Sequence, residues 1–448
     1  MDFKEFLKNA ANVKPNKQQL SMLRETPFYA FVHFSPNTYT NLEWGDGTED
    51  PAIFNPTSLD CDQWARAIKS AGMKGMVLTA KHHDGFCLWQ TKYTEHSMKN
   101  SPYKNGKGDI VKEAAEACKR HGLKFGFYLS PWDRNSPLYG TDEYNDYYKN
   151  QLTELLTNYG EIFYVWFDGA CGEGPNGKKQ EYDFEGYIDL IKKHQPNAAV
   201  FHDTGMIRWC GNEAGVAPFA QWAVVPYELC PLNEKQTNGK LIEGDISFAY
   251  NTDLNIGSIA NIMYSEGLVF APAETDMSIR PGWFYHEDEE PHSPERLFNT
   301  YISSVGNNAT FTLNIPPMPD GRFNDKDVAR LNALGRLISD ELGTNLAKGI
   351  TPEILPGYGA TQPEYVIKLN SPKEIKYVDI AEKISEGQKV EDFSVFAKDK
   401  HGQYTTIAKG TTIGSRRILK TSVVTTDEIK VRINYARDIP IMEWIKIY

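Results

Sequence analysis

The sequence has no long apolar run and no long run of basic residues. No stretch approaches the roughly 18 consecutive apolar residues that a membrane-spanning helix needs. The formal net charge is -11, with 48 basic and 59 acidic side chains. These features argue against a transmembrane protein and against a surface for nucleic acid or anionic membranes. A small, neutral ligand fits the composition better.

The first 20 residues are polar and charged, unlike a secretory signal peptide. We therefore expect a soluble protein. The location that we expect is periplasmic or secreted, with any signal peptide lying outside these 448 residues.

The cysteines are few and scattered. None of them forms a Cys-x-x-Cys pair, so a zinc ribbon or a thioredoxin-like site is not expected. We expect most of them to be buried thiols, although their even number permits disulfides. The six are Cys61, Cys87, Cys118, Cys171, Cys210 and Cys230.

Aromatic residues are frequent, at 12% of the chain, with 24 Tyr and 9 Trp. This excess suits either stacking against sugars or a large aromatic core. A chain of 448 residues is also too long for one ordinary compact domain, so we expect two domains.

Short apolar runs alternate with amphipathic segments from about residue 27 to residue 342. This alternation predicts repeated β-α units, and eight such strands imply a (β/α)₈ TIM-like barrel over residues 1–343. The loop-rich stretch 227–265 leaves the sixth and seventh units weakly defined. The expected strands are 28–35, 75–83, 124–130, 162–168, 198–203, 221–226, 268–273 and 310–317, and the expected helices are 62–71, 110–121, 143–159, 184–194 and 294–305.

After residue 343 the pattern changes to strict alternation, as in residues 428–433, where every second side chain is apolar. Turn-forming residues also recur at short intervals. We expect residues 344–448 to form an antiparallel β-sandwich. It either caps the barrel or binds sugar.

Polar residues gather where the predicted barrel strands end. Because catalytic groups of such barrels lie at the carboxyl ends of the strands, we expect a polar pocket there. A metal site is not expected, since neighbouring residues on a strand point to opposite faces unless the strand has ended. The residues concerned are His33, His82, His83, Asp84, Tyr128, Asp168, His202 and Asp203.

Asp168 follows six apolar residues and precedes a glycine that allows a sharp turn. One interpretation is an aspartate that caps the next helix. A carboxylate that faces a pocket is more naturally a nucleophile or a base.

Several motifs, taken in order, resemble glycoside hydrolase family 29, the α-L-fucosidases. None of them is specific alone, but their order and joint presence are. They cover the whole predicted barrel and lie at residues 31–35 (Phe-Val-His-Phe-Ser), 43–44 (Glu-Trp), 81–86 (Lys-His-His-Asp-Gly-Phe), 126–128 (Gly-Phe-Tyr), 166–169 (Trp-Phe-Asp-Gly), 280–286 and 306–317.

The resemblance implies a retaining exo-hydrolase that removes terminal α-L-fucose from an oligosaccharide or glycoconjugate with two carboxyl groups and no cofactor. By motif match, Asp168 is the nucleophile and Trp283 forms part of an apolar wall for the fucose methyl group. The positions that the family uses to hold fucose hydroxyls are His33, Trp44, His82, His83, Tyr128 and Trp166.

The acid/base is Glu213 by this resemblance, because residues 208–215 resemble the acid/base loop of the subgroup that acts on α-1,3/1,4-linked fucose. Glu287, in an acidic run at 287–290, is the alternative. We expect desolvation to raise the pKa of the acid and hydrogen bonds to keep Asp168 ionised. Two other functions stay open: a glycosidase for a related sugar such as galactose, and a carbohydrate-binding barrel without catalysis.

Overall fold

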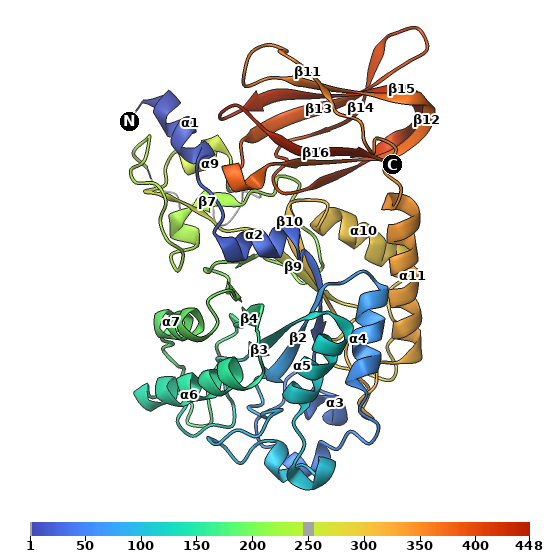
Figure 1. Cartoon of the computed structure of the whole chain (residues 1–448). Coiled ribbons are helices and arrows are strands. Elements are labelled where there is room, and N and C mark those ends of the chain that lie inside the picture. The colour runs from blue at the N-terminus through green and yellow to red at the C-terminus, as the bar shows by residue number, and fades with distance from the viewer. Residues whose placement is uncertain (1, 245–254) are drawn as a thin grey trace.

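The computed structural model describes residues 2–244 and 255–448, and its largest sheet has eight parallel strands (Figure 1). The strand order is β5-β4-β3-β2-β1-β10-β9-β6. The ends of this order meet at one parallel bridge between Phe201 and Ile207, so the sheet forms a nearly closed barrel. The strands are β1 (Phe28–Val32), β2 (Gly75–Lys81), β3 (Lys124–Leu129), β4 (Tyr164–Trp166), β5 (Ala199–Phe201), β6 (Arg208–Trp209), β9 (Ala273–Ser278) and β10 (Ala309–Asn314).

Six helices follow barrel strands and pack against the outside of the sheet. Five of them begin at an Asp, Asn or Ser whose side chain accepts a hydrogen bond from the first turn, which satisfies a backbone N–H that would otherwise lack a partner. The six are α4 (Cys61–Ser70), α5 (Ile110–His121), α6 (Asp142–Asn158), α7 (Phe184–His194), α10 (Pro294–Ser304) and α11 (Asp325–Leu342).

Shorter elements precede the barrel or lie in its loops. The helices are α1 (Phe3–Ala11), α2 (Lys17–Arg24), α3 (Asn37–Thr40) and α9 (Ile259–Ile262), and the 3₁₀ turns are η1 (Pro51–Ile53), η2 (Met98–Asn100), η3 (Tyr103–Gly106), η4 (Tyr227–Leu229) and η5 (Ile384–Glu386).

The barrel is confirmed, but the prediction of its sixth and seventh strands was wrong. Residues 221–226 and 268–273 contain β7 (Val224–Pro226) and β8 (Leu268–Phe270), which pair antiparallel in a separate two-stranded sheet. The barrel uses β6 and β9 instead. The strand β9 (Ala273–Ser278) is buried at every position but contains polar side chains. A search for apolar runs therefore could not predict it. Within the described residues, no helix separates β5 from β6.

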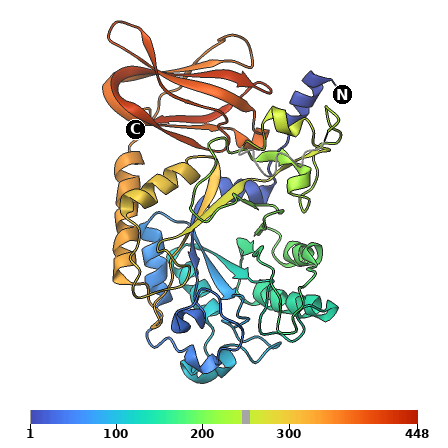
Figure 2. The same cartoon turned by 180° about the vertical axis from the view of Figure 1, so that it is seen from behind.

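The C-terminal region is the expected antiparallel β-sandwich (Figure 2). Its two long strands, β12 and β15, pair with each other, and β13 pairs with the second part of β15. The first part of β12 pairs with β11, and its last part pairs with β16. Ile418 donates its N–H to the carbonyl of Gly306, which joins the sandwich to the segment before β10. The strands are β11 (Glu353–Leu355), β12 (Glu364–Glu382), β13 (Val390–Lys398), β14 (Tyr404–Gly410), β15 (Arg417–Ala436) and β16 (Met442–Ile447).

All six cysteines are free thiols, and four of them are buried. Among residues 2–244 and 255–448, no helix combines the length and the apolar character that a bilayer crossing demands.

Candidate active site

A cavity of about 330 Å³ lies at the carboxyl ends of the barrel strands. All nine residues to which the family resemblance gave the nucleophile, the preferred acid/base or a substrate-binding role line it, whereas His202, which was also expected in the pocket, does not. Asp203 also lines it, whereas Asp84 is buried outside the cavity, where it accepts hydrogen bonds from Ser35 and from the Phe86 N–H. The nine are His33, Trp44, His82, His83, Tyr128, Trp166, Asp168, Glu213 and Trp283.

Asp168 stands two residues beyond β4, and its carboxyl oxygens have separate partners. Oδ2 accepts the Tyr128 hydroxyl at 2.9 Å, and Nε2 of His83 lies 3.6 Å from the same oxygen. Oδ1 accepts the Ala170 N–H at 2.8 Å. The expected hydrogen bonds are present, but desolvation outweighs them and raises the pKa of Asp168 above its ordinary value. The side chain remains 24% exposed toward the cavity.

Three buried histidines form the wall beside Asp168. Both His82 and His83 face the cavity because β2 ends at Lys81 and the strand alternation stops there. Burial lowers the pKa of His33 and of His83 to about 3, and that of His82 well below its ordinary value. The three rings are therefore neutral near pH 7. Neutral rings offer hydrogen bonds to hydroxyl groups without adding charge.

The Nδ1 atoms of the three histidines differ in their hydrogen-bond partners. Nδ1 of His33 lies 2.9 Å from Oδ1 of Asn314, and Nδ1 of His83 lies 2.7 Å from Oγ of Ser130. These contacts fix the orientation of both rings. Nδ1 of His82 is buried and has no hydrogen-bond partner among the described residues.

Glu43 ties two walls of the cavity together. Its carboxylate accepts the backbone N–H of Trp283 at 2.8 Å and that of Phe284 at 3.2 Å. Trp44 is 55% exposed at the cavity mouth, edge-on to the ring of His83. The loop after β1 and the loop after β9 thus present Trp44 and Trp283 to the same space.

A buried carboxyl group that the sequence motifs did not indicate lies behind Trp166 and does not itself line the cavity. Glu274 on β9 accepts hydrogen bonds from the hydroxyls of Tyr29 and Tyr164 and, at 2.8 Å, from Nε1 of Trp166. Burial raises its pKa to about 7. The indole N–H of Trp166 is already used by this contact, so Trp166 offers mainly its ring to the cavity, stacked on Phe201.

Glu213 lies in a short loop that follows β6 and is hydrogen-bonded to the neighbouring strand β9 at both of its ends. Cys210 donates its N–H to the carbonyl of Glu274, and Gly215 donates to that of Asp276, each at 2.9 Å. The side chain of Glu213 accepts Nε1 of Trp283 at 3.2 Å and lines the cavity. Glu287, the alternative acid, does not line it.

Asp276, also on β9, is a second residue that was not predicted from the sequence, and it lines the cavity. It is 4% exposed, and its Oδ1 accepts Nε1 of Trp209 at 2.9 Å. The available signal was the polar alternation Glu274, Asp276, Ser278 within an otherwise buried segment. Such spacing places all three on one face of a strand.

No group of three or more histidine, cysteine, aspartate or glutamate side chains suited to a metal ion occurs in the described part of the chain.

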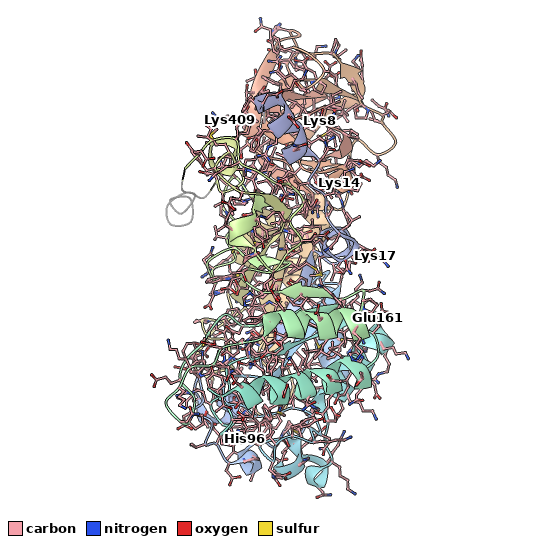
Figure 3. All side chains as sticks on the ribbon, turned by 90° about the vertical axis from the view of Figure 1, so that its left-hand side faces the viewer. Lys8, Lys14, Lys17, His96, Glu161 and Lys409 are labelled. Carbon is pink, nitrogen blue, oxygen red and sulfur yellow. The ribbon has the colours of Figure 1, made fainter. Side chains whose placement is uncertain are left out.

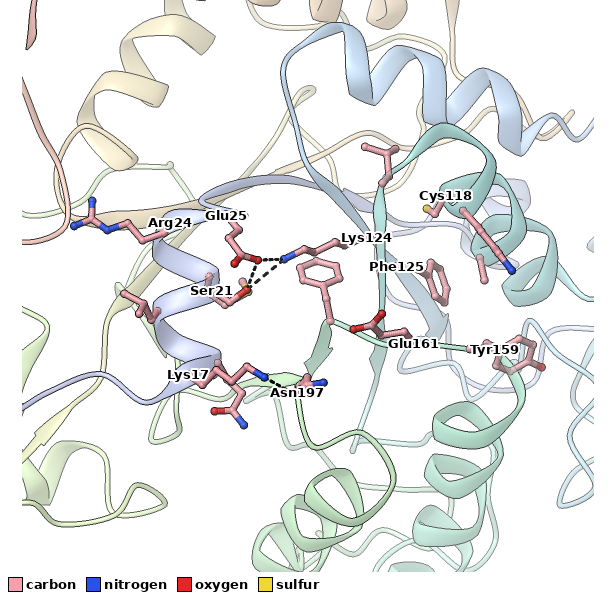
Figure 4. Close-up of a pocket in the computed structure, with 18 of the residues that line it drawn as sticks. Lys17, Ser21, Arg24, Glu25, Cys118, Lys124, Phe125, Tyr159, Glu161 and Asn197 are labelled. Atoms are coloured by element: carbon pink, nitrogen blue, oxygen red, sulfur yellow. Dashed lines mark hydrogen bonds and ion pairs between the residues drawn. The ribbon is translucent and has the colours of Figure 1, made fainter. Parts of the chain in front are cut away.

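A larger hollow of about 990 Å³ lies at the amino ends of the strands (Figure 4). Several of its polar groups are paired with one another: Nζ of Lys124 lies 2.7 Å from Glu25 and 3.2 Å from Ser21, and Lys17 donates to Asn197 at 3.0 Å. Lys17 and Glu161 at its rim project outward (Figure 3). Catalytic groups of these barrels lie at the other end, so the smaller cavity is the candidate active site.

Comparison with known proteins agrees with the geometry. The family model for α-L-fucosidase matches residues 16–341. α-L-Fucosidase 1 of Arabidopsis thaliana is 37% identical over 97% of this chain and 87% of the relative. A glycoside hydrolase 29 protein from a rumen bacterium is 39% identical, with a TM-score of 0.85 over 98% of this chain and 77% of its own. A Ruminococcus gnavus glycoside hydrolase 29 fucosidase, in complex with fucose, is 29% identical, with a TM-score of 0.82 over 98% and 95%. The chain therefore belongs to glycoside hydrolase family 29, the α-L-fucosidases.

Proposed function

We propose that this α-L-fucosidase is a retaining exo-enzyme in which Asp168 is the nucleophile and Glu213 the acid/base. The observation that carries the proposal is that both carboxyl groups line one cavity but have different surroundings. Asp168 is held by Tyr128 and a backbone N–H, whereas Glu213 lies on a loop tip beside an indole. A cavity of about 330 Å³ suits a terminal sugar rather than a length of chain.

In the first displacement, Asp168 attacks the anomeric carbon of the α-fucoside and Glu213 protonates the departing oxygen. This step breaks the glycosidic bond and forms a β-linked ester between fucose and Asp168. In the second displacement, Glu213 removes a proton from water, which attacks the same carbon and releases α-fucose. The hydroxyl of Tyr128 stabilises the Asp168 carboxylate before attack and after release.

We further propose that His33, His82, His83 and Tyr128 hold the sugar hydroxyls. Nδ1 of His82 is buried without a hydrogen-bond partner in the described part of the chain, and an unpaired buried nitrogen costs free energy that ordered water or a ligand removes. Trp283 and the ring of Trp166 supply apolar surface for the fucose methyl group, and Trp44 covers the mouth. The substrate is a fucosylated oligosaccharide or glycoconjugate.

The proposed linkage is α-1,3/1,4. It rests on the resemblance of residues 208–215 to the acid/base loop of that subgroup and on the position of Glu213 at the cavity. We also propose that residues 1–343 form the catalytic domain and that residues 344–448 cap it, since the sandwich packs near the amino end of β10 and away from the cavity.

The test of the acid is Glu213→Ala, with Glu287→Ala as the matched control. Natural fucosides have alcohol leaving groups that require protonation, so Glu213→Ala should slow them by about 10²–10⁴-fold. Aryl fucosides with acidic phenols should suffer far less in the first step. Azide should rescue the second step and yield the α-fucosyl azide. An equal loss on every leaving group, or the selective loss in Glu287→Ala instead, would contradict the assignment.

Stereochemistry and linkage are tested on the wild-type enzyme. We expect ¹H NMR to show α-fucose as the first product, and inversion to β-fucose would contradict retention. We expect α-1,3/1,4-fucosides of Lewis type to be hydrolysed faster than α-1,2-fucosides, and the reverse order would contradict the linkage. An aryl galactoside, assayed in parallel, tests the alternative sugar.

A further inference from the structure

Asp276 is a buried carboxyl group in the active-site cavity to which the proposed mechanism assigns no step. It lies two residues after Glu274 on β9, so both side chains point to the same side of the strand. Glu274 has three side-chain donors in the barrel interior, beneath the cavity. Asp276 sits nearer the carboxyl end, and its Oδ1 accepts the indole N–H of Trp209 at 2.9 Å.

Trp209 stands at the foot of the loop that carries Glu213. Trp209 lines the cavity and is 37% exposed. Few neighbours restrain an exposed side chain, so the hydrogen bond to Asp276 fixes the position of its ring. Immediately after Trp209, Cys210 donates its backbone N–H to the carbonyl of Glu274. Gly215 donates its backbone N–H to the carbonyl of Asp276. Four residues therefore bulge out between two anchors on β9.

Asn212 stiffens the bulge from within. Its Oδ1 accepts the N–H of Ala214 at 3.1 Å, and its Nδ2 donates to the carbonyl of Val216 at 2.9 Å. Glu213, between them, is held from outside by Nε1 of Trp283 at 3.2 Å. The position of Glu213 thus depends on the two ends of a short, internally bonded loop.

We propose that Asp276 is a positioning residue for the proton donor: its carboxyl group fixes Trp209 at the foot of the loop and so holds Glu213 over the glycosidic oxygen. This inference rests on the proposed role of Glu213. Burial, with Glu274 on the same strand and Glu213 on the loop, raises the pKa of Asp276 well above its ordinary value. The raised pKa favours the neutral form of Asp276, and this form does not repel Glu213 after Glu213 has donated its proton.

The test compares Asp276→Ala, Asp276→Asn and Trp209→Phe on two substrates: an α-1,3/1,4-fucoside, which needs protonation, and an aryl fucoside with an acidic phenol, which does not. Asp276→Ala and Trp209→Phe should lower kcat on the first by about tenfold or more, because a misplaced catalytic group costs up to about 10²-fold. On the second substrate the loss should stay below about threefold. Asp276→Asn keeps an oxygen acceptor and should retain most activity. The double variant, Asp276→Ala with Trp209→Phe, should be no slower than either single variant.

Trp444→Phe is the matched control, because Nε1 of Trp444 donates to Oδ1 of Asp379 at the same 2.9 Å in the sandwich. It should show no selective loss. Equal losses on both substrates, or an Asp276→Asn variant as slow as Asp276→Ala, would overturn the inference. If Asp276→Ala does not fold, Trp209→Phe decides alone. A Glu213→Ala variant without leaving-group dependence overturns the acid role itself, whereas normal dependence there and none in Trp209→Phe overturns only the positioning role.

Discussion

The two ends of the barrel carry two hollows of very different character. At the amino end, the hollow of about 990 Å³ contains one exposed ion pair, Lys124 with Glu25, and a hydrogen bond from Lys17 to Asn197. At the carboxyl end, a cavity of about 330 Å³ holds aromatic rings, neutral histidines and carboxyl groups with raised pKa values.

Volume therefore does not identify the active site of this molecule. Titratable groups withdrawn from water, with partners that shift their pKa values, are what distinguish the smaller cavity. The larger hollow instead contains an exposed ion pair, Lys124 with Glu25, and such surface pairs contribute little free energy.

The largest effect is expected at the carboxyl end, from Asp168→Ala. Without the attacking carboxylate, kcat should fall by at least about 10³-fold, while the thermal unfolding midpoint stays near that of the wild type. Azide should restore a slow reaction and give the β-fucosyl azide, the opposite configuration from the Glu213 variant.

Asp203→Ala is the comparison for that variant, because Asp203 lines the same cavity after the neighbouring strand β5. It should retain far more activity than Asp168→Ala. Near-wild-type turnover by Asp168→Ala, or a larger loss in Asp203→Ala, would show that Asp168 is not the nucleophile.

A smaller effect is expected from Tyr128→Phe. The Tyr128 hydroxyl donates to Asp168 and favours its ionised form, so removing it should raise the pKa of Asp168 further. The acidic limb of kcat/KM should move to higher pH by up to about one unit, which lowers activity below the limb by up to about tenfold.

Tyr148→Phe is the control for the pH profile, since the hydroxyl of Tyr148 donates to the carbonyl of Leu129 at 2.7 Å and not to the nucleophile. Its acidic limb should stay in place. A limb that stays fixed in Tyr128→Phe, or moves to lower pH, would show that this hydrogen bond does not control Asp168.

The smallest effect is expected at the amino end, from Lys124→Met. The lysine side chain is 38% exposed and its partner Glu25 is 64% exposed, so the ion pair is screened by solvent. The free energy of unfolding should change by less than about 1 kcal/mol, measured by urea denaturation, and kcat should not change. A marked loss of turnover would mean that the larger hollow takes part in the reaction.

The alternation of apolar and amphipathic segments predicted the barrel, and the strict alternation after residue 343 predicted the sandwich. The family motifs predicted nine of the residues that line the cavity. Apolar runs located β1 to β5 and β10 because these strands are buried on both faces. The same signal failed at β6 and β9. On β9, Glu274 and Asp276 face the barrel interior. Hydrogen bonds from other strands compensate the free-energy cost of burying these carboxyl groups.

Those compensating partners, Trp166 and Trp209, are distant from β9 in the sequence. Their pairing with Glu274 and Asp276 depends on the closed barrel, so no local pattern could predict it. Likewise, the apolar runs at β7 and β8 indicated strands correctly but gave no information on which sheet they join.

A covalent bond between Asp168 and fucose is the step on which the proposed mechanism depends most directly. A fluorinated fucosyl fluoride whose second displacement is slow would trap this intermediate, and peptide mass spectrometry would locate it. We expect one fucosyl group per chain, attached to Asp168. A label on Asp203, Glu213 or Asp276, or steady turnover of the reagent with inversion and no label, would contradict it.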